Sequence, residues 1–394
     1  MMKEKMRPLW AEINLDHLAY NVRNIKKLVG KSRLVAIVKA DAYGHGASCV
    51  ARTMVEAGAE AFGVAIITEA LEMRESGIRE TIMVLSYTPP AYFSDAIRND
   101  IILNCLSYED VEKLDQVAGE LKMTAKILIS LDTGISRVGF QPDEEGIAEI
   151  IRMKKLKNIE LNSIYTHFAS ADFEDKKTTL IQLEKYKYAI GKLKEAGVVF
   201  EHEHVANSAA IVDMKETYLE SVRPGIILYG YHPSDEVRKE NLSLKPVMSI
   251  KGKIIQLKTV PKGTGISYGH RYITDKEKTK IATIAIGYAD GYSRRLSNRA
   301  DVMLQGKRAR VVGNICMDMC MIDVTDFEER PQISDEVVLF GIQKVGEEEY
   351  SLPVDELSDL LDTINYEITC LVGKRVPRVY LENGNIVHMH SCIW

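Results

Sequence analysis

Residues 34–46 read Leu-Val-Ala-Ile-Val-Lys-Ala-Asp-Ala-Tyr-Gly-His-Gly. The first five residues are apolar, uncharged and partly β-branched, which is typical of a buried strand. Lys39 follows the strand directly, although an ammonium group is costly to bury without a partner. Two glycines come next and allow the backbone to approach a ligand closely. Lys39 is therefore either a nucleophilic amine at the end of a barrel strand or a solvated lysine that leaves the sheet.

The unit that contains Lys39, an apolar strand followed by a polar turn and an amphipathic helix, repeats along the chain. The expected strands are 34–39, 61–66, 82–86, 101–106, 126–132, 161–167, 202–206 and 222–229, and the helices between them include 47–58, 69–76, 108–121, 143–155 and 178–196. Eight such units predict the α/β class and a closed (β/α)₈ barrel, with an open doubly wound sheet as the alternative. No Gly-x-Gly-x-x-Gly follows the first strand, which disfavours dinucleotide binding.

A second domain is expected after a charged linker at 235–240. We place the boundary so that residues 1–241 form the barrel and residues 242–394 form the second domain. Short alternating segments predict a mostly antiparallel β domain with one helix near 353–362; its strands are expected at 247–257, 281–287, 300–304, 308–313, 321–324, 336–340 and 378–381. The alternating segment 10–15 could pair with this domain, and Asp16 is expected to cap the helix after it.

Bulk composition indicates a soluble globular protein. Of 394 residues, 46% are hydrophobic and 27% are charged, and the net charge of −5 argues against a general nucleic-acid binder. The first residues lack the apolar core of a signal peptide. The sequence has no run of about 18 apolar residues, so we expect no membrane span. Six cysteines are scattered without the spacing of a disulfide framework, so we expect reduced thiols and a cytoplasmic location.

Polar residues stand where the predicted barrel strands end. They are 132–139 (Asp-Thr-Gly-Ile-Ser-Arg-Val-Gly), 165–167 (Tyr-Thr-His), 206–208 (Ala-Asn-Ser) and 223–226 (Arg-Pro-Gly-Ile). Each of these segments alone is more often an ordinary turn or a buried polar residue. In a barrel, however, the carboxyl ends of the strands meet at one face, where active sites are built. Their convergence with Lys39 would make them candidate site residues.

The second domain carries further candidates. Tyr268 is followed by glycine in Ser267-Tyr268-Gly269, a polar kink occupies 313–320, and Tyr366 lies in 363–367. The Cys-x₃-Cys pair within 313–320 has no second pair of ligands nearby, so we expect no metal site there. The tail 388–392 alternates like an edge strand, and metal capture there has weak support.

Five motifs in a single order make the chain similar to a known family. They are Val-Lys-Ala-Asp-Ala-Tyr-Gly-His-Gly at 38–46, Ser-Tyr-Gly at 267–269, Ile-Cys-Met-Asp at 315–318, Thr-Ile-Asn-Tyr-Glu at 363–367 and Arg-Val-Pro-Arg at 375–378. Together they resemble the alanine racemases, pyridoxal 5'-phosphate enzymes with a (β/α)₈ barrel followed by a β domain. The resemblance extends from Arg7 to about residue 380.

The resemblance implies interconversion of L-alanine and D-alanine by two bases, which supplies D-alanine for cell-wall peptidoglycan. Lys39 would bind the cofactor covalently and act on the D-enantiomer, and Tyr268 would act on the L-enantiomer. The residues implied in cofactor binding are Lys39, Tyr43, His167, Asn207, Ser208, Arg223, Gly225, Ile226 and Tyr366. Arg137 and the backbone N–H of Met317 would bind the substrate carboxylate. Tyr268 and Met317 would reach into a second subunit, so a homodimer with shared sites is implied.

One position departs from the family pattern. Many members have a carbamylated lysine, paired with the substrate-binding arginine, two residues before the Asp-Thr-Gly; here that residue is Ser130. We predict that a bound anion such as chloride, or a nearby acceptor, pairs with Arg137 instead. Three alternatives remain open: a racemase of broader or serine specificity, a decarboxylase with the same two-domain layout, and a non-enzymatic cofactor carrier.

Overall fold

The computed structural model describes residues 7–391. By its internal contacts the chain divides into two compact units. One is His17–Lys245, and the other combines the residues up to Asp16 with those from Pro246 onward. The boundary at 241/242 stays a prediction, and each unit is described by itself.

The barrel unit is built on eight parallel strands in the order β8-β7-β6-β5-β4-β3-β2-β9. Their bounds are β2 (Arg33–Ile37), β3 (Ala61–Val64), β4 (Thr81–Val84), β5 (Ile101–Cys105), β6 (Ala125–Leu131), β7 (Ile159–Thr166), β8 (His202–His204) and β9 (Ser221–Val222). The backbone N–H of Arg223 donates to the Ala206 carbonyl at 2.9 Å, so the segment that follows β9 is bonded to the segment that follows β8. The predicted barrel is confirmed, and the open sheet is excluded.

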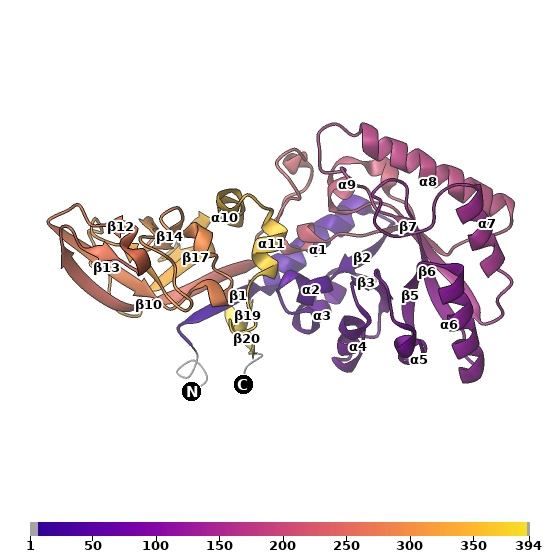
Figure 1. Ribbon diagram of the computed structural model, residues 1–394, viewed down its shortest axis with the longest axis horizontal. Helices are drawn as coiled ribbons and strands as arrows, with labels where there is room; N and C mark the ends of the chain where they lie inside the picture. Colours follow the sequence, from indigo (N-terminus) through magenta and orange to yellow (C-terminus); the bar gives the residue numbers. More distant parts are fainter. Residues whose placement is uncertain (1–6, 392–394) are drawn as a thin grey trace. The chain divides into compact units, whose positions relative to one another are not determined.

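Helices flank these strands (Figure 1). They are α1 (Leu15–Val29), α2 (Lys39–Tyr43), α3 (Ala47–Ala57), α4 (Ile67–Glu75), α5 (Phe93–Arg98), α6 (Tyr108–Leu121), α7 (Glu144–Met153), α8 (Lys177–Glu195) and α9 (Ser208–Asp213), with short 3₁₀ turns η2 (Pro90–Tyr92), η3 (Lys215–Thr217), η4 (Ile226–Tyr229) and η5 (Lys239–Asn241). In α6 the Ser107 hydroxyl caps the first turn, and Val111, Leu114 and Ala118 are buried at helical spacing. Asp16 was predicted to cap the helix after it, and this prediction is wrong: α1 already begins at Leu15, and Asp16 lies in its first turn.

The eighth predicted strand, 222–229, is largely wrong. Only Ser221–Val222 pair as β9, and η4 replaces the rest. Pro224 has no N–H to donate to a sheet ladder, so the strand stops there. The apolar residues of η4 are nevertheless buried, which explains why they resemble a core strand in the sequence.

The C-terminal unit contains a ten-stranded sheet. Its strands are β1 (Leu9–Asn14), β10 (Met248–Pro261), β13 (Lys278–Ile284), β14 (Asp301–Leu304), β15 (Lys307–Arg310), β16 (Cys320–Asp323), β17 (Glu336–Val345), β18 (Glu348–Leu352), β19 (Arg378–Glu382) and β20 (Asn385–His390). All their pairings are antiparallel except that of β1 with β19, so the predicted mostly antiparallel class is confirmed. β1 pairs with β10 on its other side.

Smaller elements complete this unit. They are the hairpin β11 (Gly265–Ile266) and β12 (Tyr272–Ile273), the helices α10 (Val354–Leu361) and α11 (Asn365–Cys370), and the turns η6 (Tyr268–His270), η7 (Tyr288–Asp290) and η8 (Arg294–Leu296). α10 matches the expected helix, and Pro353 precedes its first turn. Cys392, the last residue of the predicted edge-strand tail, lies outside the described residues.

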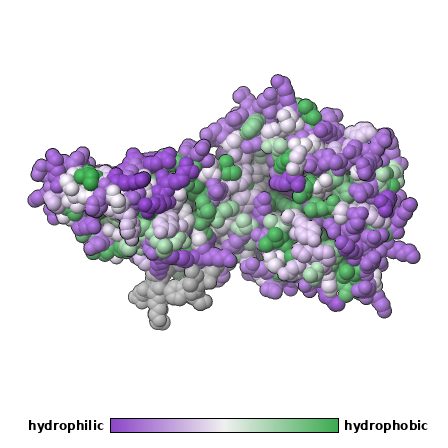
Figure 2. Space-filling model, in the orientation of Figure 1, coloured by the Kyte–Doolittle hydropathy of each residue, from purple (hydrophilic) through white to green (hydrophobic). Residues whose placement is uncertain are grey.

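Surface composition is ordinary for a folded domain. Hydrophilic side chains cover most of the visible barrel unit in Figure 2, with apolar side chains between them. Within the described range, none of the helices combines the length and the apolar composition that a membrane crossing needs.

Candidate active site

Lys39 begins a turn of unusual hand. It is exposed just beyond β2, and the next four residues, Ala40 to Tyr43, all have φ between 52° and 54°. For Ala40, Asp41 and Ala42 ψ is also near 50°, so the segment is one turn of left-handed helix. None of the four is glycine, and such a turn costs roughly 1–2 kcal/mol per residue. We expected a glycine-rich loop here; the structure instead has a strained and defined turn.

A small group of hydroxyls surrounds the backbone of Gly225. The Gly225 N–H donates to Ser208 Oγ at 2.8 Å. A Cβ added to Gly225 would lie 2.7 Å from the Tyr43 hydroxyl, so a larger residue at this position would displace that hydroxyl. Asn207 acts one step away, because its side-chain oxygen accepts the Ala210 N–H at 3.0 Å and caps α9 behind Ser208. Ile226 follows Gly225 and begins η4.

Arg223 is buried beside the ends of β7 and β8. Its Nη2 donates to the Thr166 carbonyl at 2.7 Å, and its Nη1 lies 2.8 Å from His204 Nδ1 and also donates to the His204 carbonyl. Burial lowers the Arg223 pKa to about 10, so the guanidinium is still a cation at neutral pH. Within residues 7–391, Nε–H is the guanidinium donor that has no hydrogen-bond acceptor.

His204 is a site residue that sequence reasoning did not single out, and Tyr165 was named only as part of the polar segment 165–167. His204 is fully buried, and its ring stacks on Tyr165 with centroids 5.5 Å apart. The Arg223 guanidinium also lies over the Tyr165 ring, with its Cζ 4.9 Å from the ring centroid. The available signal was weak: His204 is a histidine inside the predicted strand 202–206, two residues before the segment 206–208.

His167 lies among three cations. Burial first, and then the charges of Arg223, Arg137 and Lys39, lower its pKa to about 3. His167 is therefore neutral at any working pH. Because the charges of Arg223, Arg137 and Lys39 all act on His167, these four residues, which were predicted at the ends of separate strands, are brought together. Such a concentration of positive charge favours anionic groups.

Arg137 and Ser130 have unsatisfied polar groups. Within the described residues, the Arg137 guanidinium has no hydrogen bond or ion pair, and it is exposed. The Ser130 hydroxyl is buried beside the Tyr165 side chain and has no hydrogen bond of good geometry there. The loop that carries Arg137 is itself held, because Asp132 Oδ1 accepts the N–H groups of Gly134 and Ser136. A buried free hydroxyl and an unpaired guanidinium are suitable donors for an anion.

Tyr268 projects from a locked backbone in the C-terminal unit. Its side chain is 69% exposed, while its neighbours Ser267, Gly269 and His270 all have positive φ. Ser267 Oγ donates to the Asn314 carbonyl at 2.6 Å, and Asn314 Nδ2 donates to the Tyr268 carbonyl at 2.6 Å. Backbone strain of this kind persists only where the surrounding structure holds it, and it is concentrated at functional sites.

The Met317 amide is held in one orientation. The Tyr288 N–H donates to the Cys316 carbonyl at 3.1 Å, and the Ala289 N–H donates to the Met317 carbonyl at 3.0 Å. A Cβ on Gly287 would lie 2.3 Å from each of these two carbonyls. Because a peptide is planar and trans, the Met317 N–H points away from the carbonyl of Cys316, and it has no acceptor among the described residues.

An ion-pair network supports this segment. Arg375 pairs with Asp318 at 2.6 Å and with the buried Asp290 at 3.3 Å. Asp290 also accepts two hydrogen bonds from Arg7 and one from the Gly287 N–H. Tyr366, the remaining predicted residue, lies half-buried in α11.

Comparison with known proteins identifies the family. The family model described as "Alanine racemase, N-terminal domain" matches residues 13–233, and "Alanine racemase, C-terminal domain" matches residues 247–380. The chain belongs to the alanine racemase family. This finding confirms the predicted resemblance and the class of enzyme, an isomerase, and it removes the decarboxylase and carrier alternatives.

Individual alanine racemases match over nearly the whole chain. A relative named alanine racemase from Clostridium tetani is 47% identical over 100% of both chains. The alanine racemase structure from Clostridium difficile 630 has a TM-score of 0.94 at 42% identity and covers 99% of this chain and 100% of its own. That from Bartonella henselae, described as having covalently bound pyridoxal phosphate, has a TM-score of 0.83 at 28% identity, covering 95% and 99%.

Proposed function

We propose that this protein interconverts L-alanine and D-alanine with pyridoxal 5'-phosphate, by proton transfer at Lys39 and Tyr268, and so supplies D-alanine for peptidoglycan. The observation that carries the proposal is the set of contacts of Arg223. Its two Nη groups are bound to protein acceptors, and its Nε–H is left as a fixed, buried, charged donor. A pyridine nitrogen is an acceptor that fits this donor.

The residues around Arg223 fit the rest of the cofactor. The hydroxyls of Tyr43 and Ser208, with the backbone of Gly225 and Ile226, would hold the phosphate, and Asn207 would fix Ser208 by capping α9. His167 would lie beside the ring, Tyr366 would contact the phosphate, and Lys39 would bind covalently through its ε-amine. When bound, the cofactor supplies an electron sink that lets the α-proton of an amino acid be removed.

Racemisation requires proton removal on one face and return on the other. Lys39 Nζ would take or give the proton of D-alanine, and the Tyr268 phenol oxygen would do so for L-alanine. A phenol is a weak base near neutral pH unless cations stabilise its anion. Arg223 would provide that stabilisation. Because the pKa of His167 is about 3, His167 would pass on the effect as a neutral hydrogen-bonding group and not as a second cation.

Substrate selection would rest on two anchors. Arg137 and the free Met317 N–H would bind the carboxylate, while Tyr268 and Tyr366 would crowd the side chain and favour alanine. A racemase of broader or serine specificity is the alternative.

We further infer a homodimer with shared sites. The supporting observation is exposure: Tyr268 is 69% and Met317 is 52% exposed, although both belong to well-held segments. Exposed apolar groups in rigid segments are typical of an interaction surface. Cys105, Cys316 and Cys320 are free thiols, which agrees with a reducing compartment such as the cytoplasm.

A covalent-trapping experiment tests the proposal. The purified enzyme is reduced with borohydride in the presence of pyridoxal 5'-phosphate, digested, and analysed by mass spectrometry, and α-deuterium incorporation is followed for a panel of amino acids. We expect the adduct on Lys39 and the fastest incorporation with alanine. An adduct on another lysine, or no incorporation with alanine, would contradict the proposal. Serine exchanging as fast as alanine would favour the broader specificity.

A further inference from the structure

The left-handed turn after Lys39 depends on external support. Inside the turn, the Ala42 N–H donates to the Val38 carbonyl at 2.8 Å and the Gly44 N–H to the Ala40 carbonyl at 3.0 Å. The far end is held by His45, whose Nδ1 lies 2.9 Å from the Ala42 carbonyl and 3.0 Å from the Tyr43 carbonyl. Those contacts stabilise the C-terminal part of the turn and leave its first peptide to another group.

Glu69 binds that first peptide. The Ala40 N–H, which belongs to the peptide bond between Lys39 and Ala40, donates to Glu69 Oε1 at 2.6 Å. The second carboxylate oxygen, Oε2, accepts the N–H groups of Ala65 at 2.8 Å and Ile66 at 3.3 Å, where α4 begins. One carboxylate therefore connects the chain just after β2 with the chain just after β3, and these two strands are paired neighbours in the barrel.

The chemistry of the contact requires a carboxylate. All three partners of Glu69 are N–H donors, and an ionised carboxylate only accepts. A glutamine of the same shape has one accepting oxygen and one NH₂ group. Its NH₂ would have to face an N–H either at Ala40 or at the start of α4, so one of the two connections would be lost.

We infer that Glu69 is a positioning residue for Lys39: by holding the Lys39–Ala40 peptide it sets the direction in which the lysine side chain leaves the barrel strand. The inference rests on the proposed role of Lys39 as cofactor anchor and base for D-alanine. Glu69 itself need not contact substrate or cofactor. Its loss should therefore impair the Lys39 half of the reaction and spare the Tyr268 half.

Isotope effects distinguish the two halves. The test compares Glu69→Gln holoenzyme with wild type and with Glu72→Gln, a control on the exposed side of the same helix. If Lys39 is misplaced, proton removal from D-alanine becomes slower, so the primary deuterium isotope effect on kcat/KM should rise with α-deuterated D-alanine. With α-deuterated L-alanine the isotope effect should fall, because the later proton delivery by Lys39 then limits the rate.

Cofactor release gives a readout that does not depend on activity. We expect Glu69→Gln to lose bound pyridoxal phosphate on dialysis at least severalfold faster than Glu72→Gln. Glu69→Asp provides a second variant, since the shorter side chain keeps a carboxylate near Ala65 and Ile66 and withdraws it from Ala40. It should show the same opposite changes in the two isotope effects even if Glu69→Gln folds poorly.

The outcomes separate this inference from the proposed function. If the wild type carries its cofactor on Lys39 and racemises alanine, but the Glu69 variants lose only thermal stability and keep both isotope effects, the positioning role is wrong. If the wild type has no adduct on Lys39, the proposed function itself fails.

Discussion

Nη1 of Arg223 lies 2.8 Å from Nδ1 of His204, and the contact determines the protonation of the histidine. A guanidinium can only donate, so Nδ1 accepts and the ring proton resides on Nε2. Burial and the Arg223 charge hold the pKa of His204 well below its ordinary value. At the bottom of the candidate site, one buried cation therefore lies next to neutral imidazoles.

This arrangement predicts the pH dependence of stability. Both His167 and His204 have a folded-state pKa below the ordinary value of 6.5, so below pH 6.5 the unfolded chain binds more protons than the folded chain. The contribution of these two histidines to the free energy of unfolding should therefore be fully present above about pH 6.5. It should fall with decreasing pH by up to about 1.4 kcal/mol per pH unit for each histidine.

Denaturant unfolding at pH 7.5 and 5.5 measures this slope. His167→Asn should reduce the loss between the two pH values. Equal slopes for the wild type and His167→Asn would show that His167 is not held neutral by its surroundings.

Arg223 should also limit side reactions. Because its pKa stays near 10, it cannot give a proton to a pyridine nitrogen, and the cofactor remains a weaker electron sink. In Arg223→Glu we expect racemisation to fall roughly 10- to 100-fold, since a hydrogen bond to a charged group contributes about 1.5–3 kcal/mol. Transamination, followed as pyruvate formation, should rise, whereas Arg223→Lys should show no such gain. Undetectable transamination in Arg223→Glu would count against this account.

A small anion should take the place of the carbamylated lysine of other family members. Among the described residues the Arg137 guanidinium has no hydrogen bond or ion pair, the buried Ser130 hydroxyl has no hydrogen bond of good geometry, and Ser130 cannot form a carbamate. Replacing chloride with gluconate in the assay should raise the KM for alanine with a smaller change in kcat. Bicarbonate should have no effect on the wild type, while Ser130→Lys should gain a response to it. Activity of the wild type that rises steeply with bicarbonate would refute the anion.

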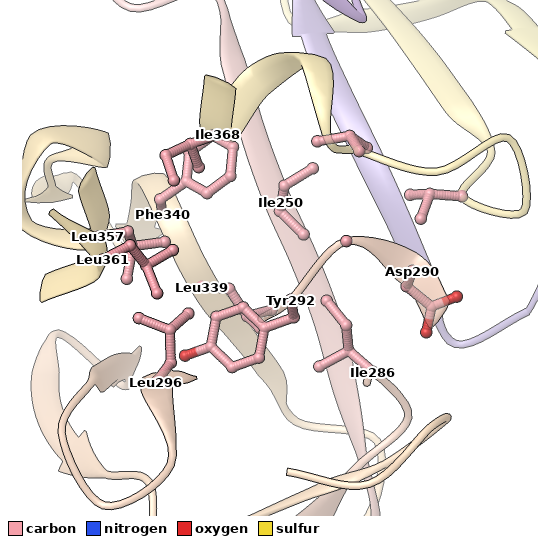
Figure 3. A pocket seen from close by; sticks show the side chains of 13 residues that line it. Ile250, Ile286, Asp290, Tyr292, Leu296, Leu339, Phe340, Leu357, Leu361 and Ile368 are labelled. Carbon is pink, nitrogen blue, oxygen red and sulfur yellow. The ribbon is translucent and has the colours of Figure 1, made fainter. Parts of the chain in front are cut away.

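Tyr292 offers a test of packing in the C-terminal unit. It lines an apolar cavity of about 20 Å³, and Figure 3 shows its hydroxyl on the side where Leu296 lies. The hydroxyl is fully buried and has no hydrogen-bond partner among residues 7–391, and burial raises its pKa well above the usual value. Tyr292→Phe should therefore keep or increase the free energy of unfolding, by up to about 1 kcal/mol.

Tyr229→Phe is the matched comparison. The Tyr229 hydroxyl is equally buried but donates to the Ile37 carbonyl at 2.9 Å, so its removal should lower stability by about 1 kcal/mol. Denaturant midpoints give both values. A clear loss of stability in Tyr292→Phe would mean that its hydroxyl has a partner, such as an ordered water.

The barrel could be predicted from sequence because its strands are apolar, short and regularly spaced, and α6 was predicted to the residue. Strand eight was missed because Pro224 ends a run that is still buried. The turn after Lys39 could not be foreseen, since alanine disfavours the left-handed region and aspartate visits it only as a single residue. The supporting contacts come from His45, just beyond the turn, and from Glu69, which is 29 residues away from Ala40 in the sequence. His204 was missed because a histidine within a strand has no local signal of the arginine it contacts.

The most direct test of the two-base account is deuterium exchange in Tyr268→Phe. The variant is incubated in D₂O with each alanine enantiomer, and the α-carbon is followed by NMR. We predict that D-alanine still gains deuterium through Lys39 without forming L-alanine, while L-alanine gains none. Equal exchange of both enantiomers, or equal loss of both, would contradict the assignment of one base to each face.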